Sequence, residues 1–164
     1  MHGRWRYARR GGRRFDRGFS LVELVTAVGV VAIVAAVGVP ELAAYNAQYR
    51  LTSAARQLAV DLTRARMKAI GENLYVRVQF GSNSVGSLAQ GNTYRLAISS
   101  DGTTYTSFGD PVQLPAGVSF YALPTQVSFS GQGFATAPAT LWAYNHRYQW
   151  RVVTVNSLGK VTVQ

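Results

Sequence analysis

A long apolar run near the start of the chain, interrupted by one carboxylate, constrains the fold more than any other feature. Between Phe19 and Val39 the only strongly polar side chain is that of Glu23. The run is long enough to cross a hydrocarbon core of about 30 Å as a single helix. Because an ionised side chain within a membrane costs a few kcal/mol unless it is paired, we expect Glu23 to have a cationic partner.

The segment before the apolar run is strongly basic and carries a single acid, Asp16. The positive-inside rule places this segment in the cytoplasm and the rest of the chain on the other side of the membrane. A secretory signal peptide has a shorter apolar stretch and a small-x-small cleavage site, whereas this run is long and ends at Gly38-Val39-Pro40. The basic segment contains the arginines Arg4, Arg6, Arg9, Arg10, Arg13, Arg14 and Arg17.

The formal net charge of +10 is divided unevenly along the chain. Residues 1–18 account for +6 and the remainder for +4, so the basic balance that would indicate nucleic acid lies mostly in the N-terminal segment. The chain has no cysteine, which excludes a disulfide framework and a thiolate metal site. The domain outside the membrane must therefore rely on its own core.

The apolar run is predicted to continue as one amphipathic helix to about Ile70, where Gly71 suits the helix C-terminus. Pro40 is expected to kink this helix, because proline removes a backbone hydrogen bond and crowds the preceding turn. The amphipathic half carries one apolar stripe at alternating spacings of three and four, formed by Ala55, Leu58, Leu62, Ala65 and Ala69.

Beyond Gly71 the apolar period changes to two, which is typical of strands. Asp101-Gly102 is a hairpin-turn signal, and residues 81–86 are predicted to form a loop. A helix followed only by strands favours an α+β domain in which the helix stripe covers one antiparallel sheet. The predicted strands are residues 74–80, 94–98, 104–108, 112–114, 118–121, 126–130, 139–144, 147–155 and 160–164.

The junction Gly18-Phe19-Ser20-Leu21-Val22-Glu23-Leu24 resembles the class III signal of type IV pilins and type II secretion pseudopilins. The resemblance implies that a prepilin peptidase cuts between Gly18 and Phe19, removes the leader 1–18 and methylates the Phe19 amine. It also implies that Glu23 pairs with the N-terminal amine of a neighbouring subunit. Residues 19–40 would be the transmembrane and assembly helix, with Pro40 at a family proline position, and residues 41–164 the extracytoplasmic domain.

Several later motifs are similar to those of the GspH/FimT branch of minor pilins and pseudopilins, although another minor pilin of the same architecture remains an alternative. The resemblance implies a pilin-like structural subunit of a type IV pilus or a type II secretion pseudopilus, and it does not separate the two systems. Its partners would be other pilins or pseudopilins, and it would reside in the bacterial inner membrane with a cytoplasmic N-terminus and a periplasmic or extracellular domain. The motifs lie at 54–58, 62–66, 69–70, 76–78, 127–133 and 152–161.

The sequence predicts no enzyme, no cofactor and no metal site, because His146 has neither a second histidine nor a carboxylate nearby in sequence. A DNA-binding minor pilin is the alternative function, with DNA contacts at Arg147, Arg151 and Lys160. We favour it less, because Lys160 stands alone where DNA-binding members of the family carry an arginine-rich pattern, and three charges give modest, salt-sensitive affinity.

Aromatic residues surround these C-terminal arginines and allow two interpretations. The bases of a nucleic acid could stack on the rings of Trp142, Tyr144, Tyr148 and Trp150. The period of two instead places them as two pairs on adjacent strands, and we favour cross-strand aromatic packing.

Overall fold

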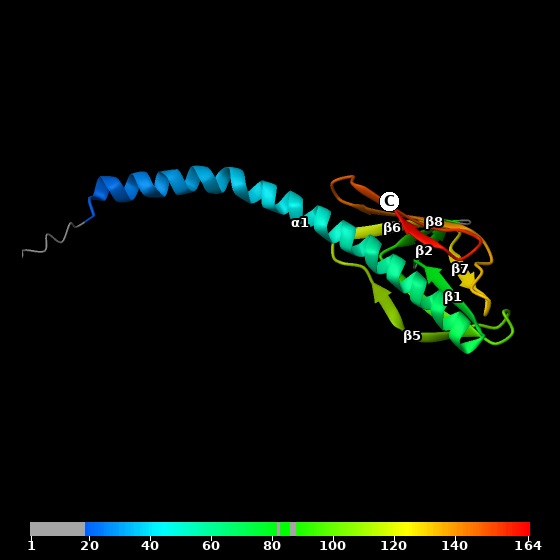
Figure 1. Ribbon diagram of the computed structural model, residues 1–164. Coiled ribbons are helices and arrows are strands. Elements are labelled where there is room, and N and C mark those ends of the chain that lie inside the picture. Colours follow the sequence, from blue (N-terminus) through cyan, green and yellow to red (C-terminus); the bar gives the residue numbers. More distant parts are fainter. Residues whose placement is uncertain (1–18, 82, 86–87) are drawn as a thin grey trace, which may run out of the picture. The chain divides into compact units, whose positions relative to one another are not determined.

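The computed structural model describes residues 19–81, 83–85 and 88–164 (Figure 1). The predicted leader 1–18 lies outside the described residues. The chain divides into two compact units, residues 1–40 and 41–164. One helix, α1 (Leu21–Glu72), contributes to both units and includes Pro40.

Helix α1 ends two residues beyond the predicted Ile70, and its cap is Asn73 rather than Gly71. Asn73 adopts a left-handed conformation with φ of +50°. The backbone N–H of Leu74 donates to the carbonyl of Ala69 at 3.1 Å, and that of Asn73 to the carbonyl of Ile70 at 3.4 Å. These two bonds form a Schellman motif, in which asparagine can replace glycine because it tolerates the left-handed region.

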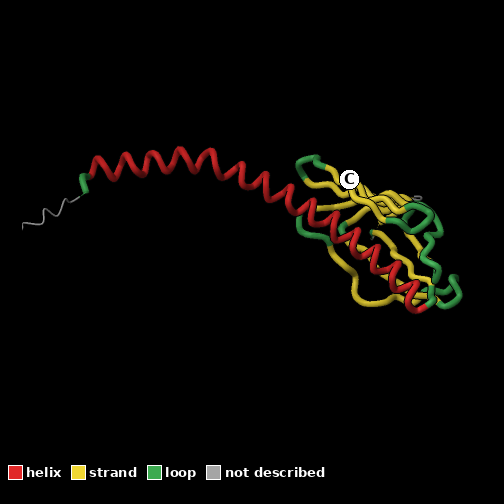
Figure 2. Tube along the Cα trace, viewed as in Figure 1, coloured by secondary structure: helices red, strands yellow, loops and turns green. Residues whose placement is uncertain are grey.

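The strands of the domain form two antiparallel sheets where one was predicted (Figure 2). One sheet has the order β5-β4-β1-β7 and the other β10-β9-β8-β6-β3-β2. The strands are β1 (Tyr75–Phe80), β2 (Asn83–Val85), β3 (Leu88–Gly91), β4 (Thr93–Ser99), β5 (Thr106–Gln113), β6 (Val118–Leu123), β7 (Gln126–Phe129), β8 (Ala139–Asn145), β9 (Trp150–Val155) and β10 (Val161–Val163).

Most predicted strands are confirmed, including the pairing of 74–80 with 94–98 and the turn at Asp101-Gly102 between β4 and β5. The predicted loop 81–86 is wrong at Asn83–Val85, because β2 pairs with β3, which the sequence did not reveal. Strands β2 and β3 are three and four residues long, too short to show the apolar alternation from which strands were predicted. The predicted strand 147–155 starts only at Trp150, because residues 146–149 form a turn.

The two predicted strands 104–108 and 112–114 are one strand, β5, which contains a bulge. Tyr94 of β4 is opposite Val112, whereas Leu96 is opposite Phe108, so extra residues of β5 are left between the two pairs. Gly109 lies in this bulge with φ of +74°. Strand β5 is at the edge of its sheet, where a bulge and a proline are tolerated.

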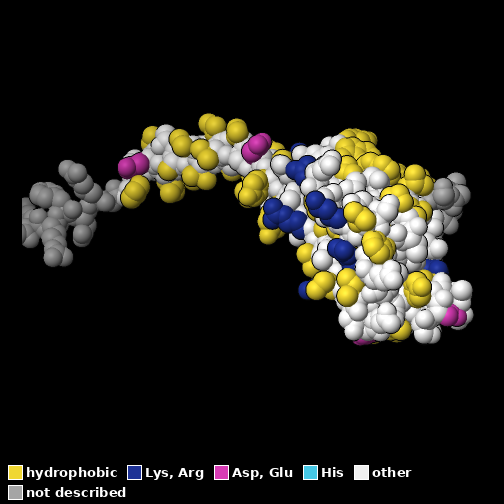
Figure 3. All heavy atoms as spheres, turned by 45° about the vertical axis from the view of Figure 1, so that its right-hand side comes forward, with side chains coloured by type: hydrophobic (Ala, Val, Ile, Leu, Met, Phe, Trp, Pro, Cys, Tyr) yellow, Lys and Arg dark blue, Asp and Glu magenta, His cyan; other side chains and the backbone are white. Residues whose placement is uncertain are grey.

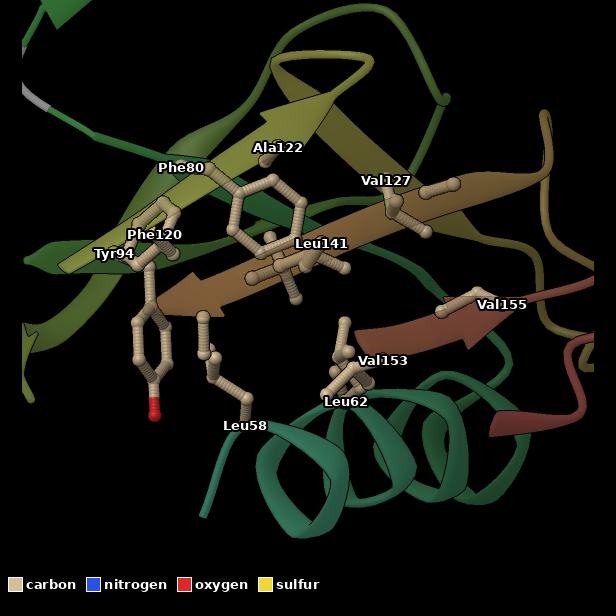
Figure 4. Packing of buried hydrophobic residues seen from close by; sticks show 14 of the residues in the cluster. Leu58, Leu62, Phe80, Tyr94, Phe120, Ala122, Val127, Leu141, Val153 and Val155 are labelled. Carbon is tan, nitrogen blue, oxygen red and sulfur yellow. The ribbon is translucent and has the colours of Figure 1, made fainter. Parts of the chain in front are cut away.

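The apolar stripe of α1 is buried, as the sequence predicted, but it packs against both sheets and not against one. Leu58 and Leu62 are each 1% exposed and point toward the sheet residues Leu141 and Val153 (Figure 4). All five predicted stripe residues are buried, and the same cluster includes residues of β1, β4, β6, β7, β8 and β9. The rings of Phe80 on β1 and Phe120 on β6 meet edge to face at 6.0 Å and join the two sheets through the core.

The last turns of α1 are held by the glycine turns of two motifs on which the family resemblance rests. The Arg66 guanidinium Nε donates to the carbonyl oxygen of Gly133 at 2.9 Å. Gly159 lies against the same contact, because a Cβ built there would be 2.2 Å from the Gly133 oxygen and 2.9 Å from Arg66 Nε. The helix and both turns therefore form one close-packed corner of the domain.

A buried polar contact also joins α1 to β4. The Tyr94 hydroxyl donates to the Asp61 carboxylate, which in turn pairs with Arg64 at 3.3 Å. Tyr94 is 1% exposed. Burial of the phenol, together with its hydrogen bond to Asp61, raises the pKa of Tyr94 above its ordinary value.

The Tyr94 contact predicts a loss of stability in alkali. Because the pKa of Tyr94 is higher in the folded chain than in the unfolded chain, its contribution to the free energy of unfolding is complete below pH about 10. At higher pH this contribution is lost, since the unfolded chain then releases a proton that the folded chain keeps. Tyr94→Phe is expected to cost about 1 kcal/mol at neutral pH and to make the alkaline decline shallower. Urea unfolding in detergent across an alkaline series measures both, with the exposed Tyr45→Phe as the control. Parallel alkaline declines in Tyr94→Phe and the unsubstituted chain would contradict this.

Candidate functional site

The described part of the first unit is an apolar helix whose side chains are exposed. Its large apolar side chains from Phe19 to Val39 are between 58% and 79% exposed. This stretch of α1 is long and apolar enough to cross a membrane. Figure 3 shows hydrophobic side chains along the visible face of this segment. An exposed apolar surface of this extent indicates that lipid or other helices cover it.

Glu23 lies in the first turn of α1, where a negative charge suits the helix dipole. Within the described part of the chain its carboxylate forms no ion pair. The nearby hydroxyl of Thr26 donates to the backbone carbonyls of Val22 at 3.0 Å and Glu23 at 2.9 Å, so it is satisfied within the helix. The Glu23 carboxylate is therefore the group in this turn that needs a partner from outside the segment.

The other predicted residues of the processing site are only partly described. Gly18 lies outside the described residues, while Phe19 precedes the helix and is 79% exposed. The first helical hydrogen bond runs from the N–H of Leu24 to the carbonyl of Ser20 at 3.1 Å. An exposed residue just ahead of a helix is accessible to a peptidase.

The structure does not gather the three proposed DNA contacts into one patch. Arg147 lies in the turn before β9, whereas Lys160 lies in the turn after it. These ends of β9 are about 20 Å apart, given about 3.3 Å per strand residue. Arg151 is half-buried at the start of β9, and its guanidinium donates to the carbonyl of Trp150 at 2.9 Å.

The aromatic residues near these arginines pack across strands, as we favoured over base stacking. Tyr144 on β8 is directly opposite Trp150 on β9, with ring centroids 5.1 Å apart. Tyr121 on β6 stacks on Tyr144 at 4.9 Å, a contact that the sequence did not reveal. The prediction was wrong for Tyr148, which lies in the turn with φ of +58° and is 85% exposed.

A pocket of about 280 Å³, which we call the basic pocket, lies where α1 meets two turns of the domain. Its charged lining side chains are Arg50 from α1 and Arg147 from the β8–β9 turn, and His146 of that turn lies beside them. The rest of the lining is Ala43, Asn46, Ala47, Ala116, Gly117, Val118 and Asn145.

The basic pocket was missed because its two arginines are far apart in sequence. Hydrogen bonds of the Asn145 side chain bring them together. The amide Nδ2 of the buried Asn145 donates to the carbonyl of Ala47 at 3.4 Å and to Gln149 Oε1 at 2.8 Å. Its Oδ1 accepts the backbone N–H of Arg147 at 3.0 Å. Asn145 thus fixes the turn that carries Arg147 against α1.

Metal ions require a set of several ligating side chains, and the described residues do not provide one. No group of three or more histidine or acidic side chains there could hold a metal ion. His146 is exposed in its turn beside Arg147 and is one of the residues that line the basic pocket.

Two family profiles match the chain and together cover most of it. The profile of the type II transport protein GspH matches residues 54–159, and that of the prokaryotic N-terminal methylation motif matches residues 13–39. The pilin-like protein PilA1 of Thermus thermophilus is 34% identical over 70 residues. That alignment covers 43% of this chain and 44% of PilA1, so the chain spans less than half the length of this relative.

Solved structures show the same pilin-like fold at low identity. The type IV minor pilin FimU of Pseudomonas aeruginosa is similar with a TM-score of 0.54 and 16% identity, over 73% of this chain and 92% of FimU. The minor pseudopilin EpsH of the type 2 secretion system of Vibrio cholerae is similar with a TM-score of 0.55 and 13% identity, over 70% of this chain and 96% of EpsH. The expected long helix on antiparallel strands is confirmed.

Proposed function

We propose that this chain, which belongs to the family of the type II transport protein GspH, works as a minor pilin or pseudopilin. A prepilin peptidase cuts it between Gly18 and Phe19 and methylates the Phe19 amine. The mature subunit is held in the inner membrane by residues 19–40, with residues 41–164 outside the cytoplasm. It then joins a type IV pilus or a type II secretion pseudopilus through the same helix.

One observation carries this proposal: an exposed apolar helix with Glu23 in its first turn precedes a domain that has its own core. In the membrane the apolar side chains are covered by lipid, and in a fibre by the helices of neighbouring subunits. When the subunit moves from the membrane into a fibre, these side chains exchange one apolar environment for another. Association is therefore directed by the polar group among them, the Glu23 carboxylate.

The partner that Glu23 requires must be cationic and must reach the same depth as its own helix start. The amine of Phe19 in a neighbouring subunit meets both conditions, because cleavage creates it four residues before Glu23. Attraction between the two charges is strengthened in the low dielectric of the membrane. The proposed role is structural, since it consists of helix packing and one ion pair. A bend at Pro40 would let the domain tilt as the subunit moves from membrane to fibre.

Processing is tested by intact mass and N-terminal sequencing after co-expression with a prepilin peptidase. We expect a chain that begins at Phe19 and carries one added methyl group on its amine. Gly18→Val should retain residues 1–18, because the peptidase must accommodate the residue before the cut. A peptidase that processes a known pilin in the same cells and leaves this chain whole would contradict the proposal.

A further inference from the structure

We infer that the basic pocket binds the phosphate of an anionic phospholipid headgroup at the outer surface of the membrane. The inference rests on the proposed membrane anchoring by residues 19–40. It concerns a different surface from the assembly helix, because every residue that lines the pocket belongs to the unit 41–164.

The charges around the pocket favour an anion. Arg50 and Arg147 are both exposed, no acidic residue lines the pocket, and neither arginine forms an ion pair within the described part of the chain. The nearest acid in sequence, Glu41, is exposed and precedes the first lining residue, Ala43. Guanidinium groups bind phosphate through paired N–H donors, and the small alanine and glycine walls leave room for the anion.

The pocket begins where the apolar segment ends. Ala43 follows Pro40 by three residues, which is about 5 Å along a helix. The headgroup layer extends roughly 5–8 Å beyond the hydrocarbon core on each side. Chain connectivity therefore keeps Ala43 close to the phosphates, and Arg50, seven residues further along the same helix, has a side chain long enough to extend back toward them.

Exposed tyrosines at the same end of the domain fit a membrane surface better than open water. Tyr45 and Tyr49 on α1 are 68% and 66% exposed, and Tyr148 in the turn beside Arg147 is 85% exposed. Tyrosine is enriched at the headgroup level of membrane proteins. Asn145 holds the backbone of the turn at Arg147 and Tyr148, so the turn need not be ordered when lipid binds, which lowers the cost of binding.

A site-specific probe tests the inference in the full chain. The sequence has no cysteine, so Tyr148→Cys gives a single attachment point for a fluorophore. Ser157→Cys, in the exposed turn at the other end of β9, is the matched control. The labelled chain is inserted into nanodiscs that contain a nitroxide headgroup quencher and either phosphatidylcholine alone or added phosphatidylglycerol. A local probe is needed because the leader arginines bind anionic lipid by themselves.

We expect phosphatidylglycerol to increase quenching at position 148 and to leave position 157 unchanged. Arg50→Gln and Arg147→Gln should each raise the phosphatidylglycerol fraction for half-maximal quenching about fivefold, the effect of one charge near the surface. Arg95→Gln, an exposed arginine outside the pocket, should have little effect. Circular dichroism verifies that each variant is folded.

The other outcomes overturn the inference in distinguishable ways. Chain recovered outside the discs would overturn both the anchoring and the inference. An inserted chain whose probe at 148 is quenched equally in both kinds of disc would overturn the inference alone. Loss of the phosphatidylglycerol effect on adding inorganic phosphate at constant ionic strength would assign the pocket to a soluble anion instead of a lipid.

Discussion

Replacing Gly159 by alanine is expected to destabilise the domain by about 2–5 kcal/mol, the sum of a conformational and a steric cost. Gly159 has φ of +73°, where any residue with a Cβ is strained. The new Cβ would also lie 2.2 Å from the Gly133 carbonyl oxygen, which belongs to backbone and accepts the Arg66 hydrogen bond. Relief of this clash must move the turn away from α1, so the Arg66 contact is lost as well.

Gly109→Ala separates the two costs. Gly109 has nearly the same φ, +74°, but a Cβ there meets nothing within 4 Å. This control should therefore lose only the conformational part, about 1–2 kcal/mol. Urea unfolding of both variants in detergent gives the two free energies of unfolding. Equal losses would show that the corner formed by Gly133, Gly159 and Arg66 adapts freely, contrary to the packing described above.

The sequence predicted the elements whose apolar period is regular. The stripe of α1 and the alternation of β1 are repeated over several residues, and burial follows that period. The short strands β2 and β3 could not be found in this way, because three or four residues are too few to show a period and the two strands are defined by their ladder pairing. The separation into two sheets depends on which strands pair over long distances, and local patterns carry little information about such pairing.

The residues of the candidate site also differ in how far local sequence could predict them. The processing and assembly residues lie within one short segment, so a local motif was sufficient to predict them, and their roles remain proposals. The basic pocket joins Arg50 to Arg147, and neither residue is unusual in its own sequence context. Only the packing of the β8–β9 turn on α1, through the amide of Asn145, makes them neighbours.

Glu23→Ala is expected to abolish incorporation of the subunit into a fibre while the domain stays folded. Removing one partner of a buried ion pair costs about 3–5 kcal/mol, because the other charge stays buried without compensation. For subunit association this corresponds to a loss of more than about a hundredfold. Glu23 belongs to the unit 1–40, whereas the core is built from residues of the unit 41–164, so unfolding of the domain should not change.

Three variants distinguish the charge of Glu23 from its shape. Glu23→Gln keeps the shape and should lose most incorporation, because an amide does not neutralise an amine. Glu23→Asp keeps the charge with a shorter reach and should restore part of it. Glu41→Ala removes an exposed acid of the same helix beyond the apolar segment and should assemble normally. The measurement is the fraction of tagged subunit in sheared fibres relative to the membrane. If Glu23→Gln assembles as well as the unsubstituted chain, polarity suffices and the amine of Phe19 is not the partner.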